Sequence, residues 1–152
     1  MTIITAPTRS PAYLRPALYA GVLLTLVATV TPLVDFATAD GIGDHVRSAY
    51  PDWPADDVAK DRMAITVYLM AVGILGLVGW MWTLAAVAGG KRSARAIGTT
   101  LFALGVTFHL TTLSVGGEAY STIVPPLHGT IAALPSLAGL IVVVGLWRRR
   151  QR

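Results

Sequence analysis

The chain contains four apolar runs, each long enough to cross a lipid bilayer as a helix. They cover about residues 14–36, 63–89, 96–115 and 126–147. A bilayer core of ~30 Å requires about 20 apolar residues at the rise of a helix, and hydrocarbon offers no partner to free backbone N–H and C=O groups. The sequence therefore predicts a single all-α domain, an integral membrane four-helix bundle, with an outer loop over 38–62.

The composition excludes several other classes of protein. Hydrophobic residues make up 54% of the chain and charged residues only 13%, whereas about a quarter of a soluble domain is charged. This excludes a soluble enzyme, a disordered tail and a nucleic-acid-binding domain, despite the net charge of +4. The chain has no cysteine, which excludes disulfides, thiolate metal sites and cysteine redox chemistry.

The charged residues are divided between the two sides of the predicted bundle. One side holds nine of the twelve Lys and Arg residues and no carboxylate, and the other holds all eight carboxylates. Cytoplasmic loops are enriched in Lys and Arg, so the predicted topology is antiparallel with both termini cytoplasmic (N-in/C-in). The nine basic residues are Arg9, Arg15, Lys91, Arg92, Arg95, Arg148, Arg149, Arg150 and Arg152.

The first apolar run has a competing interpretation as a secretory signal, because the small residues Ala37-Thr38-Ala39 follow it. A signal peptide has an apolar core of roughly 7–15 residues, and this run is longer. We therefore expect it to be a retained spanning helix.

The outer loop contains a helical pattern. Ile42, Val46 and Tyr50 recur at four-residue spacing, which predicts a short amphipathic helix at the outer interface of the membrane. Residues 51–54, Pro-Asp-Trp-Pro, end that helix. We expect Tyr50 and Trp53 to form a surface that contacts a partner.

A second helix is predicted to begin after this break and to run directly into the second span. Asp52 is the expected N-cap, and Pro54 suits the first turn. Asp56 and Lys60 are four residues apart, a spacing at which opposite charges stabilise a helix slightly.

Small residues recur along each span at three- or four-residue spacing, and Pro32 and Pro135 are expected to kink the first and fourth spans. Small residues let transmembrane helices approach closely, so these ridges predict one compact bundle. Trp80, Trp82 and Trp147 are predicted to lie in an interfacial belt near the inner face. The main ridges are Ala17, Gly21, Thr25 and Thr29 in the first span, and Gly73, Gly76 and Gly79 in the second.

Ionisable side chains within a span are candidates for function, because lipid disfavours them strongly. All of them lie toward the outer side, so any polar pocket is predicted to open outward. The ligand-binding candidates are Asp35, Arg62, Tyr68, Met70, His109 and His128, with Glu118 in the preceding loop.

This group allows several kinds of chemistry. Asp35 and the histidines could ligate a divalent metal; His109 and His128 could ligate a haem, with Met70 as a replacement for His128; or His109 could be a catalytic base oriented by Asp35. A structural interpretation also explains the pattern, with a buried histidine bonded to a neighbouring helix and Asp35 capping a helix or pairing with Arg62. We favour the structural interpretation and no particular cofactor.

The stretch 68–95 contains Gly79-Trp80-Met81-Trp82-Thr83 and Gly90-Lys91-Arg92-Ser93-Ala94-Arg95. It resembles small four-span membrane proteins of actinobacterial genomes that have no assigned activity. The segments 11–15 and 147–149 are similar too. The resemblance implies the plasma membrane of a Gram-positive-type bacterium, and it carries over no catalytic residue.

These observations predict a small multi-pass membrane protein that is not an enzyme. We expect its outer side to bind a partner protein, a lipid or a lipophilic ligand; the expected associations are with the bilayer and with a partner membrane protein or further copies of the chain. The alternative is a membrane-embedded enzyme, or a haem or metal carrier, that uses Asp35, His109 and His128.

Overall fold

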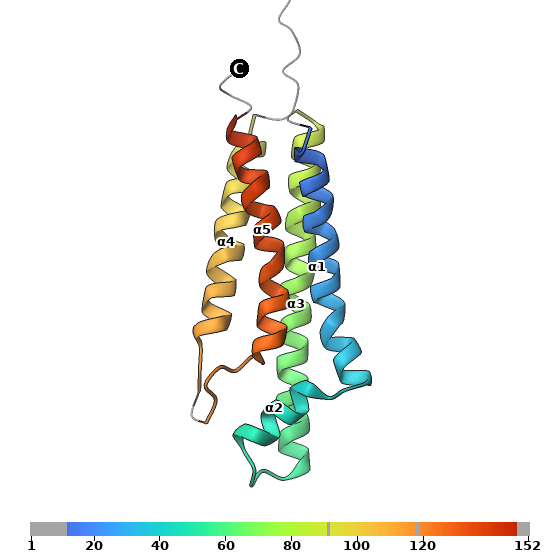
Figure 1. The fold of residues 1–152 in the computed structure, drawn as a ribbon, viewed down its shortest axis with the longest axis vertical. Helices are drawn as coiled ribbons and strands as arrows, with labels where there is room; N and C mark the ends of the chain where they lie inside the picture. The colour runs from blue at the N-terminus through green and yellow to red at the C-terminus, as the bar shows by residue number, and fades with distance from the viewer. Residues whose placement is uncertain (1–11, 91, 118, 149–152) are drawn as a thin grey trace, which may run out of the picture.

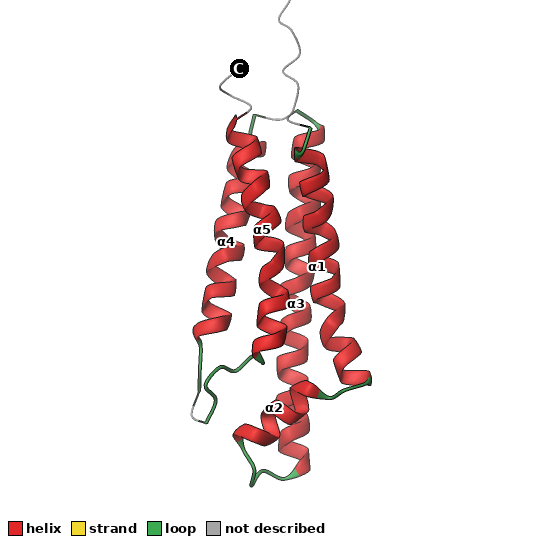
Figure 2. Ribbon diagram, viewed as in Figure 1, coloured by secondary structure: helices red, strands yellow, loops and turns green. Residues whose placement is uncertain are grey.

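The computed structural model describes residues 12–90, 92–117 and 119–148, and this part of the chain forms five helices (Figures 1 and 2). They are α1 (Leu14–Ala37), α2 (Gly41–Ala49), α3 (Ala55–Ala88), α4 (Ala94–Ser114) and α5 (Pro126–Arg148). All except α2 are long and apolar enough to cross a membrane. The predicted all-α fold with four candidate spans is confirmed. Six charged residues of the sequence analysis lie outside the described residues: Arg9, Lys91, Glu118, Arg149, Arg150 and Arg152.

The four long helices run alternately up and down in one bundle (Figure 1). The start of α1, the end of α5 and the turn between α3 and α4 share one end, which we call the terminal end. The helix α2 lies at the other end, the cap end. The most extensive packing is of α1 against α5 and α3, and α4 packs mainly on α5.

The predicted ridge of small residues on α1 is buried at Ala17, Gly21, Thr25 and Thr29. The hydroxyls of Thr25 and Thr29 each donate to the backbone carbonyl four residues earlier, at 2.8 and 2.7 Å, so they need no partner from another helix. On α3, a methyl group added to Gly73 would overlap the side chain of Thr29. Close contact between α1 and α3 thus depends on the absence of side chains.

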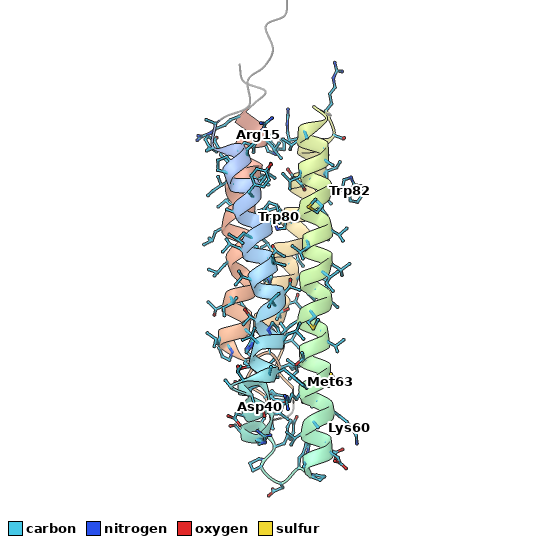
Figure 3. All side chains as sticks on the ribbon, turned by 90° about the vertical axis from the view of Figure 1, so that its right-hand side faces the viewer. Arg15, Asp40, Lys60, Met63, Trp80 and Trp82 are labelled. Carbon is cyan, nitrogen blue, oxygen red and sulfur yellow. The ribbon has the colours of Figure 1, made fainter. Side chains whose placement is uncertain are left out.

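The three tryptophans near the terminal end differ in how far they are buried. Trp80 packs among the buried residues between α1 and α3, and a methyl group added to Gly21 would overlap its ring. Trp82 and Trp147 are 59% and 54% exposed, and Figure 3 shows Trp82 projecting away from the bundle. The indole ring of Trp80 thus fills a space that Gly21 leaves on α1, while its place in an interfacial belt stays a prediction.

Most of the apolar surface of the spans points away from the bundle. In the most apolar stretch of each span, the buried share of residues is between 11% for α4 and 39% for α5. Large side chains such as Leu23, Leu75, Leu110 and Leu137 are more than half exposed. Apolar surface on this scale is costly in water, at about 25 cal/mol for each Å², whereas lipid accommodates it.

Substitution of Gly73 by Ala should destabilise the bundle, while the same change at Gly105 should not. The new methyl group at position 73 would lie 3.1 Å from the Thr29 Cα as well as overlapping its side chain, and at position 105 it would meet no atom within 4 Å. Ala is favoured over Gly within helices by up to about 1 kcal/mol, so Gly105→Ala should be neutral or stabilising. We expect Gly73→Ala to lower the free energy of unfolding in detergent micelles by about 1–3 kcal/mol, as overpacking does; equal effects at both sites would contradict the close contact.

Candidate functional site in the cap

The cap comprises residues 40–69, which include α2 and the start of α3, and the described residues of the loop 115–125. It has a hydrophobic core of its own, to which Tyr120 and Ile123 of the loop contribute. The predicted short helix is confirmed, with Ile42 and Val46 of α2 buried, and Tyr50 follows it as the C-cap. The segment is therefore a packed unit. The buried residues of this core are Ile42, Val46, Val58, Ile65, Leu69 and Val124.

The start of α3 differs in detail from the prediction. Pro54 is the N-cap, and no side chain makes a capping hydrogen bond there, so the assignment of Asp52 as the N-cap is wrong. Lys60 pairs with Asp57 at 2.8 Å, where the sequence favoured Asp56. As predicted, the helix then continues without interruption into the second span.

Asp35 joins α1 to α2. Its two carboxylate oxygens accept hydrogen bonds from the backbone N–H groups of Gly41 and Ile42, each at 3.0 Å. The residue that precedes α2, Asp40, has a left-handed backbone conformation with φ of 54° and makes no side-chain cap. Asp35 therefore caps α2 from another helix, where its negative charge also suits the helix dipole.

Arg62 joins α3 to the same junction. Its Nε lies 2.8 Å from Oδ1 of Asp40. These two atoms form an ion pair, but their relative orientation does not meet the criteria for a hydrogen bond. Its Nη2 donates to the carbonyl of Phe36 at 2.9 Å, and the guanidinium lies 3.6 Å from the centre of the Phe36 ring. The carboxylate that pairs with Arg62 is thus Asp40, and Asp35 is the one that caps. Hydrogen bonds from the exposed Arg47 to Asp40 and Asp44 raise the pKa of Arg47.

Tyr50 and Trp53 stack on each other between α2 and α3. Their ring centres are 3.9 Å apart and their planes differ by 9°. The ring of Tyr120 also packs edge-on against the ring of Tyr50, with 5.1 Å between the two ring centres. Tyr50 is half-buried, whereas Trp53 is 38% exposed. The cap therefore holds Trp53 in a fixed orientation at its surface.

Tyr120 ties the loop 115–125 to α2 and α3. Its hydroxyl donates a hydrogen bond to Asp61, and its ring stacks on His45, which is itself 2.9 Å from the carbonyl of Thr122. Burial, reinforced by this hydrogen bond, raises the pKa of Tyr120 above its usual value. The interaction is therefore fully present below the usual tyrosine pKa of about 10 and is lost only as the pH rises beyond it.

His128 lies at the start of α5 under the cap. It is 5% exposed, and neither ring nitrogen has a hydrogen-bond partner among the described residues. His109 is half-buried in α4, and within the described ranges no hydrogen bond or ion pair joins it to Asp35 or His128. Among the described residues, the structure therefore joins Asp35, His109 and His128 by no hydrogen bond or ion pair.

The other two candidates lie on α3. The Tyr68 hydroxyl shares a hydrogen bond of 2.8 Å with Thr112 of α4, which links the two helices. Met70 is half-buried. In the part of the chain that the structure describes, no three His, Asp or Glu residues are grouped closely enough to hold a metal ion.

Sequence reasoning missed Tyr120, Asp61, Asp40 and His45 as organising residues of the cap. Tyr120 lies in a short connection without helical or strand periodicity, so no local pattern marked its partners. Comparisons of the chain with protein-family models, with curated proteins and with solved structures find no match. The geometry of the cap is therefore the main guide to the function of this chain.

Replacement of Asp35 by Ala should release α2 from the end of α1. The change removes the acceptor of two backbone N–H groups, and the loss of a capping side chain costs about 0.5–2 kcal/mol. We expect faster hydrogen–deuterium exchange over residues 41–49, with the exchange of the spans unchanged. Asp44→Ala is the matched control, since that carboxylate is 70% exposed and, among the described residues, pairs with Arg47 alone. Unchanged exchange over α2 in Asp35→Ala would contradict the capping role.

Proposed function

We propose that this chain is a multi-pass protein of a bacterial plasma membrane, with both termini cytoplasmic, and that its cap binds a partner protein without catalysing a reaction. Four helices long and apolar enough to cross a bilayer support the membrane location. The resemblance to small four-span actinobacterial proteins supports the plasma membrane of a bacterium.

The distribution of charge supports the proposed orientation. At the terminal end, the described residues include Arg15, Arg92, Arg95 and Arg148. The cap end carries Asp35 and the six aspartates of residues 40–61. Because Lys and Arg are enriched on the cytoplasmic side of membrane proteins, the terminal end is assigned to the cytoplasm and the cap to the outside.

The observation that carries the binding function is the stacked pair of Tyr50 and Trp53. Aromatic side chains dominate the binding energy of protein interfaces, and a side chain that is already fixed loses less entropy on binding. Trp53 satisfies both conditions, because it is exposed and held against Tyr50. The neighbouring carboxylates of Asp52 and Asp56 are exposed, which favours a partner surface that carries basic residues.

A haem or metal carrier remains the alternative function, and one observation favours it. His128 is buried with both ring nitrogens unpartnered among the described residues, and buried polar groups are normally hydrogen-bonded. If this alternative is correct, the purified protein carries haem or a metal ion, and His128→Ala removes it while Trp53→Ala does not.

Cysteine labelling tests the proposed orientation directly, because the chain has no cysteine of its own. Ser48 of α2 and Ser93 of the turn before α4 are both exposed and lie at opposite ends of the bundle. In intact cells, a membrane-impermeant maleimide should label Ser48→Cys and should label Ser93→Cys only after the membrane is opened. The reverse pattern would overturn the orientation.

Photo-crosslinking tests the partner surface. A photoreactive phenylalanine analogue in place of Trp53 should form a crosslink to a discrete protein, whereas the same residue in place of Trp82, an exposed tryptophan on the span surface, should not. Trp53→Ala should then weaken copurification of that partner by more than about tenfold, as loss of a hot spot of 2 kcal/mol or more does. Crosslinks at both positions alike, or none at position 53, would contradict the proposal.

A further inference from the structure

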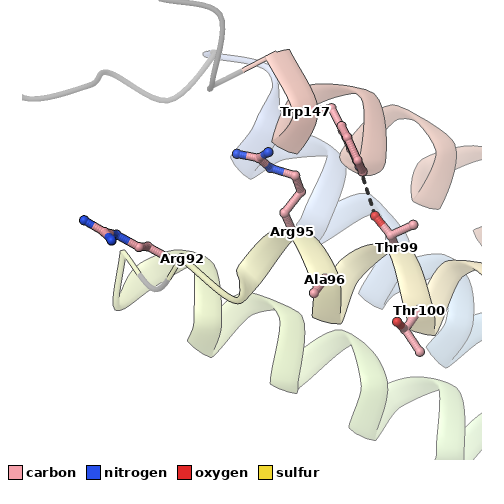
Figure 4. Close-up of a pocket in the computed structure, with 6 residues that line it drawn as sticks. All are labelled: Arg92, Arg95, Ala96, Thr99, Thr100 and Trp147. Carbon is pink, nitrogen blue, oxygen red and sulfur yellow. Dashed lines mark hydrogen bonds between the residues drawn. The ribbon is translucent and has the colours of Figure 1, made fainter.

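An open pocket lies at the terminal end, between the first turns of α4 and the last turn of α5 (Figure 4). Its volume is about 730 Å³. Two of the side chains that line it are cationic and two carry hydroxyl groups. Trp147 and Ala96 form the apolar part of the lining. The lining residues are Arg92, Arg95, Ala96, Thr99, Thr100 and Trp147.

Arg95 lines this pocket and has a hydrogen-bond donor without a partner among the described residues. Its guanidinium lies 5.3 Å from the centre of the Trp147 ring, within reach of a cation–π interaction. Its Nε is buried and has no hydrogen-bond partner among the described residues. No Asp or Glu occurs within 62–117 or 119–152, so these parts of the chain offer Arg95 no carboxylate. A buried donor of this kind is costly unless an acceptor satisfies it.

The two hydroxyls of the pocket differ from most threonine hydroxyls of the spans. Thr25, Thr29 and Thr83 donate to the carbonyl four residues earlier in their own helix. Among the described residues, Thr99 and Thr100 make no such bond; the Thr99 oxygen instead accepts from the Trp147 indole N–H at 3.1 Å. The hydroxyl protons of both threonines are therefore available to an acceptor.

We propose that this pocket binds the phosphodiester headgroup of an anionic phospholipid. Arg95 and Arg92 supply charge-assisted hydrogen bonds to the phosphate oxygens, and Thr99 and Thr100 add hydroxyl donors. The inference rests on the proposed function in one respect, that the terminal end lies at the cytoplasmic leaflet of a membrane, whose anionic lipids attract Arg and Lys.

The surface below the pocket indicates a lipid as the source of the phosphate. Ala96, Thr100, Leu104 and Phe108 follow each other at four-residue spacing and so lie along one face of α4. Leu104 and Phe108 are 58% and 46% exposed. A headgroup in the pocket therefore has an apolar path for its acyl chain along α4, which a free phosphate ion would not use.

The test compares lipid binding of the full chain in nanodiscs of phosphatidylcholine. Phosphatidylglycerol with the same acyl chains is added, and native mass spectrometry records which lipid stays bound. We expect phosphatidylglycerol to be retained in preference to phosphatidylcholine. Arg95→Gln should lower its occupancy about tenfold, the effect of losing one hydrogen bond to a charged group.

Arg15→Gln is the matched control, because Arg15 is an exposed arginine at the same end that does not line the pocket (Figure 3). It removes the same charge and should lower occupancy less than twofold. Equal losses in the two variants would overturn the proposal in favour of general attraction between a basic surface and an anionic lipid. Displacement of phosphatidylglycerol by millimolar inorganic phosphate would overturn the choice of a lipid as the ligand.

Thr100→Val keeps the test decisive if Arg95→Gln fails to fold. This variant retains every charge and the shape of the side chain, and it removes only the hydroxyl donor. It should lower phosphatidylglycerol occupancy about fivefold, the effect of one hydrogen bond of ordinary strength; unchanged occupancy would overturn the pocket. A nanodisc exposes both faces of its bilayer, so this result does not depend on the orientation of the chain in the cell membrane. The cysteine labels test that orientation separately.

Discussion

Helices in hydrocarbon gain nothing from burying apolar side chains against each other, because lipid is equally apolar. The bundle therefore depends on how closely α1 approaches its neighbours through small residues. Gly73 of α3 faces Thr29, and Gly145 of α5 faces Leu14, so α1 is packed tightly on both sides. In contrast, α4 buries only Ala94, Gly98 and Thr112. Its most apolar stretch has the smallest buried share of the four candidate spans, 11%, and it carries the exposed Leu104 and Phe108 below the arginine pocket.

The charged side chains at the two ends of the bundle differ in their partners. At the cap end, three carboxylates have partners within the chain: Asp35 accepts from backbone N–H groups, Asp40 forms ion pairs with arginines, and Asp61 accepts from the Tyr120 hydroxyl. At the terminal end, Arg95 has an aromatic neighbour but no carboxylate in its own stretch of sequence. The carboxylates that organise the cap are thus paired inside it, whereas the sequence around Arg95 offers this arginine no such partner.

The spans and the amphipathic α2 could be predicted because their signals are local and periodic. Apolar length identifies a span without knowledge of its neighbours, and Ile42 with Val46 identifies the buried face of α2. The partners of Asp35 could not be identified, because backbone N–H groups have no sequence signature. Arg62 had several carboxylates within reach, and only the left-handed turn at Asp40 decides which one it meets. The contact of Trp80 with Gly21 could not be predicted either, because the space that the ring fills is on another helix.

The continuity of α3 determines how the cap is attached to the membrane. Its 34 residues correspond to a length of about 51 Å at 1.5 Å per residue, well beyond the ~30 Å of a bilayer core. The helix therefore carries the buried Val58 and the hydrogen-bonded Asp61 of the cap on the same rigid rod as the glycines that contact α1. Where this rod leaves the spans, Arg62 fixes it to Phe36 of α1 and Asp40 beside α2. A partner that binds Trp53 is thus held at a fixed height and orientation above the bundle, which a flexible linker of the same length would not provide.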